Sequence, residues 1–263
     1  MSVHTTNRIA STLTSPMIDI HCHMLPGIDD GPGDLDESLK MARLALANGI
    51  TETIVTPHIH VGRYTNTRGS LAEATRRFQQ SLLDNDIALR VRMAGEIRIG
   101  PELMTMVEEQ QVPFLGILDG YQLVLLELPH SHIPTGSDKL VKWCLERNIR
   151  PVIPHPERNK DVIRDIETIA PLVKLGCLLQ VTAGAVAGDF GPQAKKRARQ
   201  LLKRGWVSFL ASDAHNTEHR IPDLEPGRAA AAKYIGEEES WRLVRENPAK
   251  ILYGSPQSYK HGQ

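Results

Sequence analysis

A His-x-His pair lies near the start of the chain, directly after a short apolar run. His21 and His23 follow residues 17–20, and side chains two positions apart on an extended strand point to the same face. Far along the chain, Asp213 and His215 follow a second apolar run, residues 206–212, with the same spacing. Imidazole and carboxylate groups are common metal ligands. The two pairs therefore predict one cation site to which both ends of the chain contribute.

Further metal-capable side chains stand at or near the ends of other strand-like runs. Glu127 interrupts the apolar run 123–128, where a buried carboxylate needs a partner such as a cation. Asp30 lies in the Gly-rich segment 27–33, where its neighbour Asp29 competes for the same role. The full set of candidate ligands is His21, His23, Asp30, His58, Glu96, Glu127, His155, Asp213 and His215.

This set of imidazoles and carboxylates predicts a site for two or three divalent cations. Mixed nitrogen and oxygen ligands suit Mn²⁺, Zn²⁺ or iron better than Ca²⁺. Adjacent cations lower the pKa of bound water to about 7 and clamp the oxygens of a phosphoryl group. Arg158 and Arg220 follow two of the candidate ligands, and guanidinium groups there would hold phosphate and stabilise transition-state charge. The pattern therefore predicts phosphoester hydrolysis by direct attack of a metal-bound hydroxide, without a phosphoenzyme.

The region 60–77 is basic, because it contains Arg63, Arg68, Arg76 and Arg77. Two interpretations of this region remain open. It forms a flap over the cation site, or it is an ordinary solvated helix face.

Strand-like and helix-like runs alternate along the chain, which is the pattern of a parallel sheet. The candidate ligands lie repeatedly at the C-terminal ends of about seven expected strands. That rim is where active sites form in an α/β barrel, whereas an open doubly wound sheet gathers ligands mainly at one switch point. The expected strands are 17–21, 53–56, 89–97, 121–128, 150–153, 178–182 and 206–211. The expected helices are 36–48, 70–84, 102–110, 136–147, 165–174, 193–204, 224–235 and 237–246, with a final helical turn from Asn247.

Length and composition set a few further limits on the fold class, the partners and the cellular setting. Its 263 residues suit one such barrel, and equal numbers of acidic and basic residues, 31 of each, give no bulk attraction to nucleic acid or to an anionic membrane. No apolar stretch is long enough for a spanning helix. Three scattered cysteines make no disulfide framework and fit a reduced, cytoplasmic setting. Residues 1–16 are expected to form a flexible leader and residues 255–263 a tail.

Motifs of several other catalytic classes are absent from the sequence. There is no phosphate-binding Gly-rich loop and no Gly-x-Ser-x-Gly elbow. Cys22 lies between the two histidines and should point away from the metal-binding face.

Four segments, 19–23, 56–58, 153–158 and 212–215, resemble the motifs of the polymerase and histidinol phosphatase (PHP) superfamily. The string of residues 23–31, HMLPGIDDG, is more specific. It resembles the manganese-dependent protein-tyrosine phosphatases of bacterial capsule and exopolysaccharide loci, the CpsB/YwqE type. The resemblance covers residues 17–254 and implies one domain, a distorted (β/α)₇ TIM-like barrel with three metals, usually Mn²⁺. It also implies a phosphotyrosine substrate on a cognate tyrosine autokinase that controls polysaccharide export.

The resemblance also implies residue roles by motif match. Arg158 and Arg220 match positions that contact the phosphate, and residues 37–42 take the place of a stretch linked to oligomer formation. For the proton that the leaving phenolate needs, His58 or Asp30 near the third metal is the candidate donor. The implied metal groups are His21, His23, Glu96 and Asp213; then Glu96, Glu127 and His155, with Glu96 bridging; then Asp30, His58 and His215.

Three other functions compete with this interpretation. A small-molecule phosphatase, such as a histidinol phosphatase, uses similar metals. A metal-dependent phosphodiesterase or exonuclease is a further alternative, although zero net charge and the lack of an array of stacking aromatics count against it. A non-catalytic module with a structural metal site is the third, and it would be expected to lack several of the ligands.

Overall fold

The strand that carries the His-x-His pair, β1 (Met17–Cys22), is bonded on both sides. The structure is a computed structural model and describes residues 16–254, so the predictions for the rest of the leader and for the tail lie outside the described residues. On one side β1 pairs in parallel with β2 (Ile50–Val55). On the other side, backbone bonds of 2.8 Å from Asp213 to His21 and from His23 to Ala214 join β1 to the end of β11 (Val207–Ala211). These bonds close the sheet on itself.

The remaining strands complete a barrel of parallel strands. From β11 the order runs through β10 (Leu178–Thr182), β9 (Ile149–Pro154), β8 (Tyr121–Glu127) and β6 (Glu96–Arg98) to β3 (His58–His60), while β2 pairs with β5 (Arg90–Met93). β3 continues β2, and β6 continues β5, after a break of two residues. The described chain therefore forms a barrel of seven strands, or staves, two of which are interrupted once. Backbone bonds from Ala94 to Val55 and from Glu96 to Pro57 connect the staves across the breaks. The predicted (β/α)₇ barrel is confirmed.

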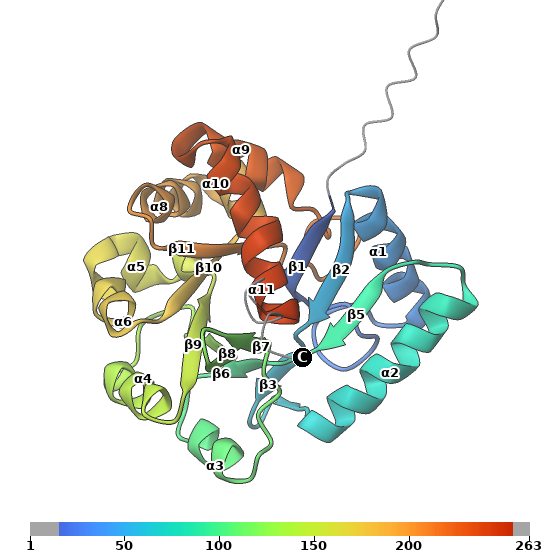
Figure 1. Ribbon diagram of the computed structural model, residues 1–263, viewed down its shortest axis with the longest axis horizontal. Coiled ribbons are helices and arrows are strands. Elements are labelled where there is room, and N and C mark those ends of the chain that lie inside the picture. Colours follow the sequence, from blue (N-terminus) through green and yellow to red (C-terminus); the bar gives the residue numbers. More distant parts are fainter. Residues whose placement is uncertain (1–15, 255–263) are drawn as a thin grey trace, which may run out of the picture.

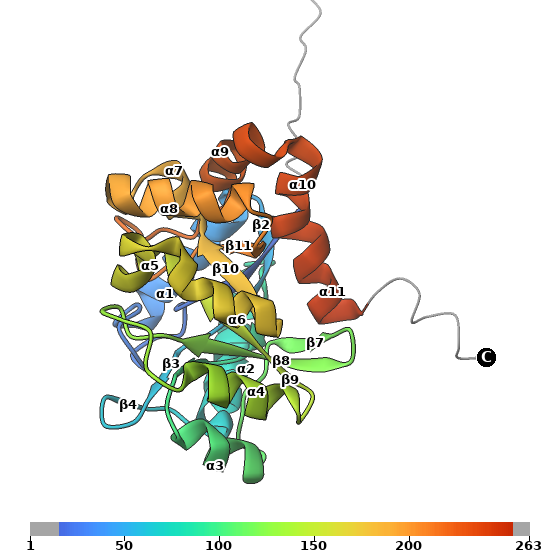
Figure 2. The ribbon, with the colours of Figure 1, turned by 90° about the vertical axis from the view of Figure 1, so that its left-hand side faces the viewer.

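The helices surround this barrel, as Figure 1 shows. Helices α10 and α11 lie together to one side in Figure 2, after the last strand. The helix bounds are α1 (Leu35–Ala47), α2 (Arg68–Asp84), α3 (Glu102–Glu108), α4 (Ser137–Leu145), α5 (Lys160–Arg164), α6 (Ala170–Leu175), α7 (Ala183–Ala187), α8 (Gly191–Lys203), α9 (Glu225–Ile235), α10 (Glu237–Trp241) and α11 (Asn247–Tyr253). No helix among the described residues is long and apolar enough to cross a membrane.

Several predicted elements are divided in the structure. The strand predicted over 89–97 is interrupted at Ala94-Gly95, where a side chain on Gly95 would lie 2.7 Å from Ile59. The helix predicted over 165–174 is a 3₁₀ turn, Ile166–Ile169, followed by α6, and the helix predicted over 237–246 is α10 followed by a π-helical turn, Arg242–Glu246. Two short antiparallel strands were not predicted: β4 (Tyr64–Thr65), which pairs with β3, and β7 (Gly116–Leu118), which pairs with β8.

Two apolar layers support the site. One fills the barrel beneath it and includes Ile20, Leu125 and Phe209, and the other packs the strands against the helices. The register between β1 and β2 shifts between Asp19 and Cys22, and such irregularities re-aim side chains next to active sites. Ile20 therefore fills the barrel while the following His21 and His23 also face inward at its rim.

Candidate metal centre

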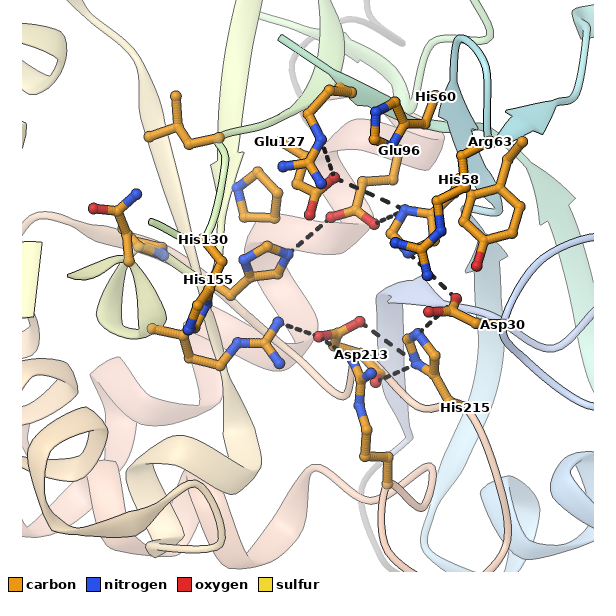
Figure 3. A pocket seen from close by; sticks show the side chains of 18 of the residues that line it. Asp30, His58, His60, Arg63, Glu96, Glu127, His130, His155, Asp213 and His215 are labelled. Atoms are coloured by element: carbon orange, nitrogen blue, oxygen red, sulfur yellow. Dashed lines mark hydrogen bonds and ion pairs between the residues drawn. The ribbon is translucent and has the colours of Figure 1, made fainter. Parts of the chain in front are cut away.

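The nine predicted ligands converge: seven line one pocket of about 310 Å³ (Figure 3), and His21 and His23 lie in the buried layer directly below it. They come from the C-terminal ends of four staves, from the first residues after the breaks in the two interrupted staves, and from the loop that follows β1. His21, His23, Glu96 and Asp213 form the buried base, and His58, Glu127 and His155 are only slightly exposed. Asp30 lies at the opening, with 40% of its side chain exposed.

The base of the site is a tight group of nitrogen and oxygen atoms. The Nε2 atoms of His21 and His23 lie 3.2 Å apart. Asp213 Oδ1 lies 3.3 Å from the first and 3.5 Å from the second. Glu96 Oε2 lies 3.5 Å and 3.4 Å from the same two nitrogens. Two imidazoles and two carboxylates thus direct their free atoms at a common centre.

Glu96 also joins this base to the two other parts of the site. Its Oε1 lies 2.8 Å from His155 Nε2, and its Oε2 lies 2.9 Å from His58 Nδ1. Glu127 Oε2 lies 3.9 Å from the same His58 nitrogen. Nearer the opening, Asp30 Oδ1 lies 3.3 Å from His58 Nε2 and 3.4 Å from His215 Nε2. Glu96 therefore lies between the base of the site and the imidazoles of His58 and His155.

Outer hydrogen bonds fix the orientation of three imidazoles. His21 Nδ1 contacts Gln180 Oε1 at 2.8 Å, and His23 Nδ1 contacts Asp29 Oδ2 at 2.7 Å. His215 Nδ1 contacts its neighbour's carbonyl, that of Asp213, at 2.9 Å. Because each acceptor requires a proton on Nδ1, the Nε2 atom of each ring carries the free lone pair. All three lone pairs face the centre of the site.

The electrostatics of the site fit divalent cations. Burial alone would raise the pKa of Glu96, but the imidazoles of His21 and His155 hold that pKa well below its usual value. Burial would lower the pKa of His58, but its bonds to Asp30 and Glu96 raise it to about 11. Burial and the Glu96 carboxylate together raise the pKa of Glu127 to about 7. In the absence of cations, the negative charge of the clustered carboxylates has to be balanced by protons bound to the imidazoles.

Buried polar atoms without hydrogen-bond partners also indicate a cation site. Glu96 Oε2 is buried and makes no well-directed hydrogen bond within the described part of the chain, although three imidazole nitrogens surround it. Lone pairs at 3.2 Å with no donor between them are unfavourable unless a proton or a cation lies there. The donor set of nitrogen and carboxylate oxygen, and the outer hydrogen bonds, are those of transition-metal sites. The residues present therefore fit a group of divalent cations.

Both predicted arginines reach the site. Their guanidinium groups bind the same carboxylate oxygen, Asp213 Oδ2, with Arg220 at 2.6 Å. The Nε atom of Arg220 is buried and has no hydrogen-bond partner among residues 16–254. Asp213 itself has a left-handed backbone, with φ of 53°, and His155 has φ of 38°. Four other described non-glycine residues also have positive φ, so this backbone conformation supports a functional site only together with the side-chain geometry.

The cysteines cannot supply a nucleophile. Cys22 is fully buried, and its Sγ contacts Thr53 Oγ1 at 3.0 Å behind β1, as strand alternation predicted. Burial raises its pKa well above the usual value, and burial also raises the pKa of Cys144 to about 11 and that of Cys177 to about 12. These thiols are therefore neutral and sequestered.

A sequence model of the family described as "Capsular polysaccharide synthesis, CpsB/CapC" matches residues 17–253. The chain belongs to the CpsB/CapC family. It is 36% identical to tyrosine-protein phosphatase YwqE of Bacillus subtilis over 90% of this chain and 91% of that protein. It is 28% identical to tyrosine-protein phosphatase CpsB of Streptococcus pneumoniae over 90% of this chain and 98% of that one. The family resemblance seen in the sequence is confirmed.

Solved structures of family members share the whole fold. The crystal structures of YwqE from B. subtilis and CpsB from S. pneumoniae, described as metal-dependent tyrosine phosphatases, include a chain with a TM-score of 0.85 and 35% identity. The match covers 91% of this chain and 95% of that one. The phosphotriesterase homology protein of Escherichia coli matches with a TM-score of 0.58 and 11% identity, a likeness of fold alone.

Beyond the predicted residues, this CpsB/CapC member places several side chains at the pocket that sequence reasoning did not single out. Arg98 Nε lies 3.4 Å from Glu127 Oε2, and Tyr64 stacks on His58 with ring centroids 5.3 Å apart. Gln180 binds a ligand imidazole from outside, and so does Asp29, which the sequence suggested only as an alternative to Asp30. Also in the lining are His60, His130 and Phe190. No residue-type signal marks a neutral glutamine or an aromatic ring as part of a metal site.

The basic region 60–77 was interpreted either as a flap over the site or as a solvated helix face, and the structure gives a different answer for each of its two parts. Arg63 lines the pocket beside Tyr64 in the β3–β4 hairpin. Arg76 and Arg77 lie exposed on α2, where both pair with Glu73. Arg68, at the start of α2, donates to the carbonyl of Gln110. The helix part is therefore a solvated face, and the hairpin part borders the site.

Proposed function

We propose that the chain is a metal-dependent protein-tyrosine phosphatase that releases phosphate from phosphotyrosine. One observation carries the proposal: nine nitrogen and oxygen ligands and two arginines meet in a single pocket at the barrel rim. The relatives' names support the choice of phosphotyrosine, because the family match covers nearly all of the described chain.

In this proposal the ligands form three groups around Mn²⁺ ions. Clusters of atoms within 4.8 Å of one another support the grouping, since His21, His23 and Glu96 form one, and Asp30, His58 and His215 form another together with His23. Glu127 and His155 both lie beside Glu96, which supports a second position there. Divalent cations bound at these positions supply an activated water at neutral pH and positive charge for the phosphoryl oxygens.

The chain's own residues bind and orient the phosphate. Arg158 and Arg220 stand at Asp213 on the same side of the pocket, from which their remaining N–H groups would grip two phosphoryl oxygens. That grip strengthens as negative charge develops in the transition state. A proton from water at the opening would reach the leaving phenolate through His58 or Asp30, which lie nearest the opening. The pocket is lined by no thiol or serine, and the proposal assigns its central carboxylates and imidazoles to cations, so no phosphoenzyme is expected.

The biological setting belongs to the same proposal. The substrate would be a tyrosine autokinase of polysaccharide export in the cytoplasm, and dephosphorylation would regulate capsule or exopolysaccharide synthesis. Self-association through residues 37–42 belongs to the same proposal, but Leu39 and Met41 of that stretch are buried in the core. Of these six residues, only Glu37 and Lys40 would be available to a second copy.

The test is hydrolysis by purified protein loaded with Mn²⁺. We expect activity on p-nitrophenyl phosphate and on a phosphotyrosine peptide, and loss of both in His21→Ala. Single turnover in ¹⁸O-labelled water should place label in the phosphate. Failure on both substrates would refute the proposal, and a higher kcat/KM for histidinol phosphate than for the peptide would make the chain a small-molecule phosphatase. Digestion of single-stranded DNA would indicate a nuclease instead.

A further inference from the structure

Asp29, the neighbour of the candidate ligand Asp30, is tied to three parts of the site. Its Oδ2 accepts hydrogen bonds from His23 Nδ1 at 2.7 Å and from the backbone N–H of His58 at 3.0 Å. Its Oδ1 accepts a hydrogen bond from the backbone N–H of Gly31 at 3.0 Å. The side chain is 1% exposed. Asp29 therefore faces away from the pocket and into the structure behind the ligands.

These contacts concentrate on one of the ligand clusters. The cluster of His23, Asp30, His58 and His215 has its ligand atoms within 4.8 Å of one another. Asp29 orients the ring of His23, fixes the backbone of His58 at the start of β3, and is bonded in sequence to Asp30. The fourth member, His215, is held by a backbone carbonyl instead.

The other ligands are supported by different groups. His21 is oriented by Gln180, which is neutral and comes from β10. Glu127 and Asp213 are contacted by Arg98 and by the pair of pocket arginines, respectively. The one anionic group that supports a ligand imidazole from outside is thus on the Asp30 side of the site, as far as residues 16–254 show.

We propose that Asp29 is a positioning residue that builds the cation position between Asp30, His58 and His215 and, through His23, gives weaker support to the position at the base of the site. A carboxylate on the outer nitrogen of an imidazole fixes its tautomer and raises its basicity, and loss of such a group costs about 10–100-fold in metal affinity. Here the same carboxylate also fixes the loop that presents Asp30. The inference rests on the proposed cation site.

The experiment counts bound Mn²⁺ by titration with electron paramagnetic resonance detection, in the wild type and in single variants. Asp29→Asn keeps the shape of the side chain but removes its charge, and Asp30→Asn removes the ligand itself. We expect Asp29→Asn to weaken the Mn²⁺ position at Asp30 by about 10–100-fold, to weaken the base position that contains His23 by less, and to leave the position at Glu127 and His155 unchanged. At the Asp30 position, the double variant should bind Mn²⁺ no more weakly than Asp30→Asn alone. Asp36→Asn, on the exposed face of α1, is the matched control.

A second variant separates this role from a general need for Asp29 in folding. A side chain on Gly31 would lie 2.4 Å from the His23 carbonyl and 3.1 Å from Asp29 Oδ1. Gly31→Ala should therefore displace the loop from Asp29 and weaken the same Mn²⁺ position, while every ligand remains. Melting of each cation-free variant reports whether it is folded.

The outcomes distinguish this inference from the proposed function. Equal weakening of every position in Asp29→Asn, or wild-type affinity at all of them, would overturn the positioning role while the wild type still binds Mn²⁺. A wild type that binds no Mn²⁺ would refute the proposed metal site itself.

Discussion

Two guanidinium groups share one carboxylate oxygen of the site, and this arrangement makes a prediction at the scale of single residues. Arg158→Ala should lower kcat/KM for p-nitrophenyl phosphate by about 100-fold, because a donor aimed at developing charge is lost. Arg158→Lys should restore little, since an ammonium cannot grip two oxygens side by side. Bound Mn²⁺ should stay at the wild-type level. Arg164→Ala is the control, because Arg164 is an exposed arginine paired with Asp161 on α5. A large loss of Mn²⁺ with Arg158→Ala would contradict the assignment to phosphate.

Protonated imidazoles give a second residue-scale prediction. The contacts of His23 with Asp29 and Glu96 overcome the effect of burial and raise its pKa to about 9, and the pKa of His58 is raised to about 11. Both rings are therefore charged in the cation-free fold near neutral pH, and the stability they add is lost only as pH rises through those values. Cations need neutral rings, so binding must release protons and weaken as pH falls. Calorimetry at about pH 7.5 in buffers of different ionisation enthalpy should show net proton release, and buffer-independent heats would contradict this.

The residue scale also shows how far sequence reasoning reaches. Eight of the nine candidate ligands were predictable because each lies at or close to the end of a strand-like run, whereas Asp30 lies in a Gly-rich loop, and the structure brings all nine together. The choice between Asp29 and Asp30 was not predictable, since two adjacent carboxylates on a turn differ only in where the backbone directs them. Gln180 carries no chemical signature of its role, because an amide inside a strand looks the same as any buried polar residue.

At the scale of elements, α7 and α9 approach so closely that a glycine is required between them. A side chain on Gly227 would lie 2.4 Å from the carbonyl oxygen of Ala183, a backbone atom that cannot rotate away. Gly227→Ala should therefore destabilise the fold by about 1–3 kcal/mol, although Gly→Ala in a helix usually stabilises it by about 0.5–1 kcal/mol. Gly69→Ala in the first turn of α2 is the matched control, since its nearest neighbour would be 3.9 Å away. Urea unfolding measures both, and equal midpoints would refute the requirement.

The elements that sequence reasoning missed or merged are short or interrupted. Pro57 lacks a backbone donor, so the stave of β2 and β3 breaks there. The helical segments between residues 156 and 164, and α7 itself, follow directly after strands and are too short for an apolar period to show. Periodicity finds long helices and buried strands well, whereas these short pieces depend on tertiary contacts.

At the scale of the whole molecule, the cation site lies where the first and last strands of the barrel meet. The closing bonds between β1 and the end of β11 lie directly beside His21, His23 and Asp213, so ligands from both ends of the described chain would hold the same ions. Closure was predictable because candidate ligands stood at the ends of nearly every expected strand. The register irregularity in β1 was not predictable, because it depends on how the two halves meet.

Removal of the cations should therefore lower the stability of the entire barrel. A ligand present at 100 times its Kd adds about 2.7 kcal/mol, and 1 kcal/mol moves the Tm of a chain of this size by about 2–4 °C. A chelator should lower the Tm of Mn²⁺-loaded protein by at least about 5 °C, and excess Mn²⁺ should restore it. His21→Ala, which removes a ligand at the closing strand, should show a smaller shift with the same chelator. A Tm that does not respond to the chelator, or an equal shift in His21→Ala, would contradict a site that joins β1 to β11 through bound ions.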